Sequence, residues 1–257
     1  MPIVKIEKLV AGGQGLAKYD GCVYFVWGVV PDDVVEVEVI KKKKNYAEAQ
    51  VTKIITPSKN RIECKEKHYQ SCSPWQIVSW EEELYWKKSI AFDNFSRLAK
   101  VDLPKELEVV SSENEQYHYR NKIEYNLIYK NSELHLALFA RKTNDLCLID
   151  ECCLAQVKLN EVAKNVLAWL NSRHDAESMQ KLVLKIDGNG EVLVGLYLEN
   201  ETNDFICPLL DDKFVGLSFF QLGTTGRTRL IKQIGKTFLT EKIKDVDLHF
   251  GLESFFQ

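Results

Sequence analysis

Short apolar runs separated by turn residues follow one another at close intervals near the start of the chain, and this spacing limits the fold most. Val34–Ile40 reads VVEVEVI, with apolar residues on one face and acidic residues on the other, which is the period of a half-buried strand. Cys22–Trp27 and Ala47–Ile55 are two further strand-like runs, and Thr56–Ser58 is a turn. Because closing a sheet of short strands hides its edges, we predict a small closed β-barrel over residues 1–58.

A different pattern follows over residues 59–106. Cysteines occur in an irregular stretch, and Ser79 then provides a helix cap before three glutamates, Glu81–Glu83. A Ser cap and acidic residues in the first turn favour a helix start. The sequence therefore predicts a Cys-containing segment and a helix at about 80–99, which form a second region of the chain.

Strand-like patterns return after residue 107. Expected strands cover residues 119–129, 133–139, 147–149, 181–186, 191–198, 214–222 and 249–255, and an amphipathic helix covers 157–170. Asp187-Gly188-Asn189-Gly190 is a hairpin turn signal. We predict a β-rich central domain over residues 107–257, so that the whole chain is mainly β with two main helices, an α+β fold.

Composition excludes several classes of protein. The 34 basic and 37 acidic residues give a net charge of −3, which rules out a uniformly basic nucleic-acid coat but leaves room for a local patch. The sequence lacks a run of 18 apolar residues, so we expect no membrane partner. Seven cysteines without an export signal predict reduced thiols and a cytoplasmic protein.

The positive charge concentrates in residues 41–61. Seven of these residues are Lys or Arg, among them Lys41, Lys42, Lys43, Lys44 and Arg61, and Glu48 is the single acid. A cationic loop on a small barrel with Tyr46 beside it suits a phosphate backbone and a stacked base. The alternative is a solvated hairpin loop without a ligand.

Four cysteines form the candidate metal or iron–sulfur set. Cys64 and Cys72 lie in the irregular segment, and Cys152 and Cys153 lie later in the chain. Their spacing matches no standard zinc motif. His68 is the histidine that falls among these cysteines, and its alternative role is that of an ordinary surface residue.

Several short motifs then occur in a characteristic order. These are Val29-Val-Pro-Asp-Asp-Val-Val-Glu-Val37, Lys43-Lys-Asn-Tyr-Ala-Glu-Ala49, Pro57-Ser-Lys-Asn-Arg61, Cys64, Pro74-Trp75-Gln76, Tyr119-Arg120-Asn121-Lys122, Cys152-Cys153-Leu154 and Leu252-Glu-Ser-Phe-Phe-Gln257. The first three resemble a TRAM domain, an OB-like RNA-binding barrel. The whole order resembles the bacterial RNA (uracil-5-)-methyltransferases, which act on ribosomal or transfer RNA with S-adenosylmethionine.

This resemblance implies an enzyme family, a substrate and a cofactor. Such enzymes add a Cys thiolate to carbon 6 of uracil, so that carbon 5 can attack the methyl group of S-adenosylmethionine. The resemblance adds Tyr119, Arg120 and Lys122 to the expected RNA contacts. Residues 1–257 would hold the RNA, 23S rRNA or tRNA, and splay the target base outward.

Two departures from the family pattern carry expectations of their own. The family often binds a [4Fe–4S] cluster through C-x5-C-x2-C and a later Cys; alignment on Pro74-Trp75-Gln76 puts those positions at Cys64, Gln70, Ser73 and Cys152. Because a cluster needs four soft thiolates, we expect it to be lost. Cys72 with His68 is the alternative metal site.

The second departure concerns the catalytic domain. The Phe-Phe-Gln motif leads into that domain in the family, and Gln257 resembles a residue that touches the reaction site. We therefore expect the catalytic nucleophile and base to be missing and the chain to be inactive alone. The alternatives are a stand-alone RNA-binding protein without catalysis and a subunit whose catalytic domain is encoded separately.

Overall fold

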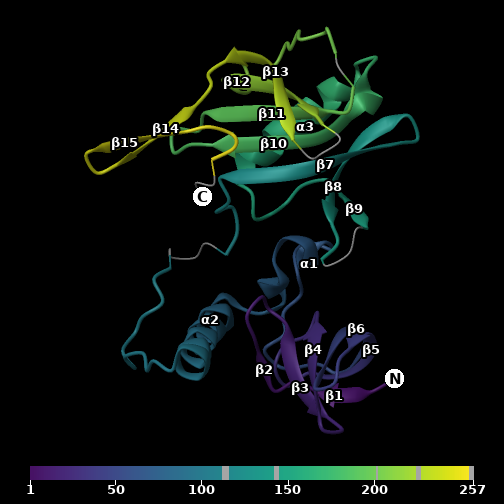
Figure 1. Cartoon of the computed structure of the whole chain (residues 1–257), viewed down its shortest axis with the longest axis vertical. Helices are drawn as coiled ribbons and strands as arrows, with labels where there is room; N and C mark the ends of the chain where they lie inside the picture. The colour runs from purple at the N-terminus through teal and green to yellow at the C-terminus, as the bar shows by residue number, and fades with distance from the viewer. Residues whose placement is uncertain (112–115, 142–144, 201, 224–226, 255–257) are drawn as a thin grey trace. The chain divides into compact units, whose positions relative to one another are not determined.

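Strands make up most of the regular structure of the chain (Figure 1). The structure is a computed structural model that describes residues 1–111, 116–141, 145–200, 202–223 and 227–254. The chain divides into two compact units, Met1–Glu115 and Gln116–Gln257. The predicted α+β class, mainly β with helices, is confirmed.

The elements of the first unit are six strands followed by helical segments. They are β1 Ile3–Lys5, β2 Lys8–Leu9, β3 Gly15–Tyr19, β4 Cys22–Trp27, β5 Val34–Lys42, β6 Tyr46–Thr56, α1 Tyr69–Cys72, the 3-10 turn η1 Pro74–Ile77, α2 Trp80–Asn94 and the π-helical turn η2 Phe95–Ala99. The predicted helix at 80–99 thus corresponds to α2 and η2 together. Ser79 caps α2 by accepting a hydrogen bond from the backbone N–H of Glu82 at 3.3 Å.

The six strands of the first unit form a barrel that is closed by its own first segment. They are ordered β1-β5-β6-β4-β3-β2. Between β1 and β2, the backbone of Ile6 exchanges hydrogen bonds with Asp32 and Asp33 on the β5 side, and the N–H of Glu7 donates to the carbonyl of Leu16 on β3. Residues 3–9 therefore pair with both edges of the sheet, as the predicted closed barrel requires.

A buried carboxylate ties this barrel to the segment that follows it. Asp33 is fully buried, and its oxygens accept hydrogen bonds from the backbone N–H groups of Val30 and Ser58, each at 2.8 Å. The guanidinium of Arg61 contacts the same carboxylate at 2.5 and 3.3 Å and also donates to the carbonyl of Gly28 at 2.9 Å. The turn before β5 and the chain after β6 are thereby joined.

The second unit is built on one large sheet. Its elements are β7 Lys122–Lys130, β8 Glu133–Phe139, β9 Leu146–Ile149, α3 Val157–Asn171, the 3-10 turn η3 Ala176–Ser178, β10 Met179–Ile186, β11 Val192–Leu198, β12 Gly216–Leu222, β13 Thr228–Gly235, β14 Leu239–Ile243 and β15 Val246–Phe250. Seven of the strands are ordered β13-β12-β11-β10-β7-β8-β9, and β14 and β15 form a separate hairpin. The β11–β12 pair is parallel, whereas the other pairs are antiparallel.

Burial on both faces explains the apolar character of the central strands. One side of α3 is buried, with Leu159, Val162 and Val166 among its least exposed residues. Every residue of β11 is buried. Apolar residues of β10, β11 and β12 also join Leu239, Phe250 and Leu252 in one core cluster. Strands buried on both faces read as continuous apolar runs, as β11 does.

Lys185 on β10 is an exception inside this core. Lys185 is fully buried. Its Nζ donates to the carbonyl of Ser254 at 2.6 Å and lies 5.0 Å from the centre of the Phe250 ring. Burial, and secondarily the charge of Lys122, which is its register partner on β7, lower the pKa of Lys185 to about 8.

Several predicted strands match the observed ones, and others were not foreseen. β4 and β8 have the predicted bounds. β3, β13 and β14 had no counterpart among the predicted strands. The strand expected at 249–255 is confirmed at His249 and Phe250, the end of β15, and is wrong over residues 251–254, because Gly251–Ser254 form a turn with a 3.2 Å hydrogen bond. Among the described residues, no helix has the length and apolar character needed to cross a membrane.

The Asp33 network predicts a large difference between two neighbouring aspartates. Asp33→Asn should destabilise the first unit by about 3 kcal/mol or more, because the buried guanidinium loses its counter-charge. Asp32→Asn is the matched control: Asp32 pairs with Lys5 at 3.0 Å on the exposed surface, where such pairs are worth less than about 1 kcal/mol. Hydrogen exchange of the β5 amides measures both changes, and equal effects would contradict the assignment.

Lys185 predicts an unusual titration. Its side-chain resonance, followed by NMR of 13C-lysine-labelled protein, should titrate near pH 8, and Lys122→Gln should raise that midpoint by removing a nearby positive charge. Since the unfolded chain keeps its proton up to about pH 10.4, folding becomes more favourable as pH rises from 8 toward that value. A midpoint near 10.4 in the folded protein would refute the buried, poorly solvated environment.

Candidate metal and RNA-binding sites

The irregular segment after the barrel packs closely on it. Val30 from the barrel forms a small apolar cluster with Ile77 and Val78, against which Tyr69 and Trp75 pack. Gly28 has a φ of +78°, and a Cβ there would lie 2.7 Å from Nε2 of Gln70. The segment therefore approaches the barrel where a glycine leaves room.

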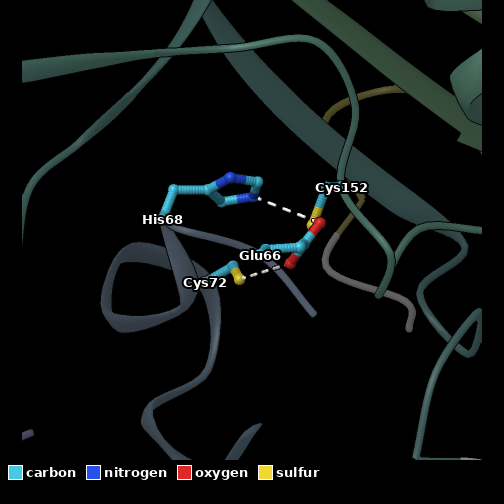
Figure 2. Close-up of side chains that lie close together, drawn as sticks. All are labelled: Glu66, His68, Cys72 and Cys152. Carbon is cyan, nitrogen blue, oxygen red and sulfur yellow. Dashed lines mark hydrogen bonds and ion pairs between the residues drawn. The ribbon is translucent and has the colours of Figure 1, made fainter. Parts of the chain in front are cut away.

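Three side chains of different chemistry meet in this segment. Glu66, His68 and Cys72 place their carboxylate, imidazole and thiol atoms within 4.8 Å of one another (Figure 2). His68 Nε2 lies 3.3 Å from Oε1 of Glu66, and the Sγ of Cys72 lies 3.4 Å from Oε2 of the same carboxylate. The local fold explains the meeting, because His68 caps α1 and Cys72 is its last residue, so the two are one helical turn apart.

A glutamine amide supports these groups from within the same segment. Gln76 is 1% exposed, and its Nε2 donates to Oε2 of Glu66 at 3.0 Å and to Sγ of Cys72 at 3.2 Å. The side chains of Glu66 and His68 are only 9% and 11% exposed. A buried amide that donates to both the carboxylate and the thiol fixes the positions of these two groups relative to each other.

The thiols named from the sequence lie in different surroundings. Cys64 is outside the group of metal-type ligands and packs on the Val30, Ile77 and Val78 cluster. Cys152, in the second unit, is buried, and its backbone exchanges two hydrogen bonds with the side chain of Asn160.

A [4Fe–4S] cluster does not fit these residues. The alignment from the sequence puts the C-x5-C-x2-C positions at Cys64, Gln70 and Ser73, of which only Cys64 is a thiol, and Cys64 lies outside the ligand-type group. With Cys72 as the middle position, the same spacing passes through Glu66, Cys72 and Trp75, of which only Cys72 is a thiol. Neither register supplies the thiolates that a cluster requires.

The basic loop keeps its charges on the surface. Lys41 and Lys42 end β5, and Lys43 and Lys44 lie in the turn before β6; all four are exposed. Their ammonium groups form no ion pair or hydrogen bond within the described part of the chain. Tyr46 opens β6 and packs its ring edge-to-face on Phe25, with 5.9 Å between ring centres.

Arg61, which we grouped with this loop, has a structural role. Its guanidinium is held by the buried Asp33 carboxylate and the Gly28 carbonyl, and its side chain is 16% exposed. A charge that is already neutralised in this way adds little to attraction for phosphate. We therefore remove Arg61 from the RNA-binding patch and keep Lys41–Lys44 with Tyr46.

The second group of expected RNA contacts precedes and begins β7. Tyr119 is 51% exposed. Arg120 is held in the chain by backbone hydrogen bonds with Leu154 and Gln156. Lys122 pairs with Glu124 at 2.9 Å, and Lys181 pairs with the same carboxylate. Burial raises the pKa of Glu124, but the two lysines outweigh this effect and hold the pKa below its usual value. Of the three, Tyr119 is the side chain most open to a nucleic-acid base.

Gln257, which we expected to touch the reaction site, lies outside the described residues.

Sequence reasoning missed Glu66 and Gln76 as members of the buried group, although Gln76 belongs to the Pro74-Trp75-Gln76 motif. The signal that could have found Gln76 is spacing, because His68, Cys72 and Gln76 follow one another at intervals of four residues. Glu66 is outside this spacing.

Comparisons with known proteins identify both parts of the chain. Residues 3–52 match the TRAM domain, and residues 87–204 match the family described as tRNA (Uracil-5-)-methyltransferase. An RNA methyltransferase of Aquifex aeolicus, described as uncharacterized, is 28% identical over 90% of this chain and 56% of its own length. The 23S rRNA (uracil(1939)-C(5))-methyltransferase RlmD of Erwinia tasmaniensis is 25% identical over 76% of this chain and 45% of its own length.

A solved structure shares the fold. The Pyrococcus abyssi tRNA (uracil-54, C5)-methyltransferase in complex with S-adenosyl-L-homocysteine superposes with a TM-score of 0.71 at 19% identity, covering 99% of this chain and 61% of its own. The chain spans about half the length of the curated relatives it matches. In one chain, a match to the TRAM domain is thus followed by a match to the tRNA (Uracil-5-)-methyltransferase family, and the relatives that cover most of the chain are named RNA methyltransferases.

Proposed function

We propose that this chain is the RNA-recognition portion of an S-adenosylmethionine-dependent RNA uracil-5 methyltransferase. The observation that carries the proposal is the group of four exposed lysines, Lys41–Lys44, on a barrel that matches the TRAM domain. The similarity to the tRNA (Uracil-5-)-methyltransferase family supplies the reaction class, and S-adenosylmethionine is the methyl donor of that reaction.

The lysines have the arrangement that a phosphate backbone requires. They lie at the end of β5 and in the turn before β6, at one end of the barrel sheet. None of them forms an ion pair among the described residues, and Glu48, which lies across from Lys41 in the β5–β6 register, is the single acid within residues 41–61. Attraction to phosphates releases condensed counterions and depends strongly on salt. The loop would therefore bind RNA through its backbone, without reading its sequence.

Aromatic side chains would add contacts with bases. The ring of Tyr46 is fixed edge-on by Phe25 at the start of β6, and Tyr119 is exposed just before β7. A base stacked on an aromatic side chain contributes about 1–3 kcal/mol. Such stacking would hold a base that has been splayed out of its helix, as uracil-5 chemistry requires.

We further propose a division of labour within the enzyme. Binding and orientation of the RNA belong to residues 1–257, and methyl transfer needs an additional domain in the same or a separate polypeptide. The substrates that the relatives' names state differ, one being 23S rRNA and the other tRNA. Binding measured with both RNAs in parallel would select the substrate class.

The salt dependence of RNA binding tests the lysine patch. Lys42→Gln with Lys44→Gln should flatten the slope of log K against log salt by about 1.4–1.8, since each lost phosphate contact changes it by about 0.7–0.9. Lys232→Gln with Lys242→Gln, exposed lysines on β13 and β14, form the matched control and should leave the slope almost unchanged. Equal slopes for the wild type and the first pair would show a solvated loop without a ligand.

Methyl incorporation tests the division of labour. The chain alone, given labelled S-adenosylmethionine and an RNA that it binds, should bind that RNA without methylating it. The rest of a relative's length, added in trans, should restore methylation of uracil carbon 5. Methylation by the chain alone would refute this part of the proposal and leave the RNA-binding part standing.

A further inference from the structure

We propose that Glu66, His68 and Cys72 bind one divalent transition-metal ion, and that zinc is the ion they select. The site uses the carboxylate of Glu66, the imidazole Nε2 of His68 and the thiolate of Cys72. Water would fill the fourth position. This assignment is independent of RNA binding and of methyl transfer.

The ligand atoms lie close enough together to share one metal ion. Zinc bonds of about 2.0–2.3 Å at tetrahedral angles place neighbouring ligand atoms about 3.3–3.8 Å apart. The Glu66 carboxylate contacts both other ligands at distances of this size, with Oε1 3.3 Å from His68 Nε2 and Oε2 3.4 Å from Cys72 Sγ. One ligand atom from each of the three residues lies within 4.8 Å of the others (Figure 2), so binding through one carboxylate oxygen requires the three groups to move slightly closer together.

The donor set decides which metal binds. One oxygen, one nitrogen and one sulfur ligand suit a borderline ion such as zinc, whereas magnesium and calcium prefer oxygen ligands alone. A [4Fe–4S] cluster is held by four cysteine thiolates, and among Glu66, His68 and Cys72 only Cys72 supplies one. The mixture of Glu66, His68 and Cys72 therefore favours a single zinc ion over a cluster.

Surrounding groups prepare these ligands for a metal. Gln76 donates to both the Glu66 carboxylate and the Cys72 sulfur, which is the outer-shell support that orients metal ligands. All three ligands are largely shielded from water. The Cys72 thiol donates to the Glu66 carboxylate, and a metal ion would take the place of that proton, because a thiol binds metals as the thiolate.

A metal here would fix a segment that has little apolar core. Only Ile77 and Val78, with Val30 of the barrel, form its buried cluster. A metal bound by Glu66, before α1, and by Cys72, at its end, would hold this four-residue helix in place. The ion is thus a structural ion, which stabilises a segment whose own buried apolar contacts are too few to hold its conformation.

Metal analysis of the purified full chain tests the site. Protein purified anaerobically with zinc present should carry about one zinc per chain and little iron. Replacing zinc with cobalt should give a thiolate-to-cobalt charge-transfer band. Cys72→Ser should abolish the band, His68→Gln should weaken metal affinity at least tenfold, and Gln76→Ala should weaken it by about ten- to a hundredfold, as outer-shell losses do.

Cys64→Ser is the matched control, since Cys64 lies in the same segment but outside the group. It should keep the band and the zinc. A chelator should lower the melting temperature of the wild type and of Cys64→Ser, and not that of Cys72→Ser. If Cys72→Ser does not fold, the cobalt band and the chelator effect on the wild type still decide the question.

Two results would overturn the proposal. One is a wild type that carries no zinc and shows no thiolate band with excess cobalt. The other is about four irons with inorganic sulfide per chain and broad visible absorbance, which would establish a cluster in place of the zinc ion.

Discussion

The carboxylate of Asp33 is the group on which the first unit depends. An ionised carboxylate without access to water is expensive unless donors surround it, and here the N–H groups of Val30 and Ser58 and the guanidinium of Arg61 do so. These donors come from the turn before β5 and from the chain after β6. The carboxylate therefore fixes where the irregular segment leaves the barrel. From that point the segment folds back, so that Gln70 packs against Gly28 and Ile77 packs against Val30.

The spacing of apolar residues and the residue types found in turns were sufficient to predict the strands and turns with strong patterns. The alternation of Val34–Ile40 predicted β5, and the Asp187–Gly190 turn predicted the β10–β11 hairpin. The missed strands have weaker patterns, because β3 reads GLAKY and β13 reads TRLIKQIG, with charged residues at irregular positions. Each is a strand because a neighbour supplies its hydrogen bonds, which is tertiary information that a local pattern does not hold.

Whether the sequence predicted the role of a site residue correctly depends on the contacts of that residue in the fold, and not on its residue type. Counting positive charges grouped Arg61 with Lys41–Lys44, but only Arg61 has a buried acid within reach. A search for thiols likewise found Cys72 and passed over Glu66. A carboxylate next to a cysteine looks like an ordinary surface acid until the fold buries it beside His68. Which charges are paired is decided by contacts between distant residues, such as Asp33 and Arg61, so the sequence alone could name the candidates but not sort them.

The two proposed sites lie at different places along β6 within the first unit. The lysine loop precedes this strand at Tyr46, whereas the segment with the proposed metal ligands packs through Gln70 on Gly28, next to Trp27, the register partner of Gln50 on β6. The four residues from Tyr46 to Gln50, at about 3.3 Å per residue, span about 13 Å. Over that distance a dication in water at physiological salt is largely screened from the lysines, because the Debye length is about 8 Å. The metal would therefore act on RNA binding chiefly through the conformation of the chain, and the barrel between the two sites is closed and tied by Asp33. One β-barrel can thus carry a charged surface for nucleic acid and, elsewhere on its wall, a metal-held segment, each with its own physical requirement.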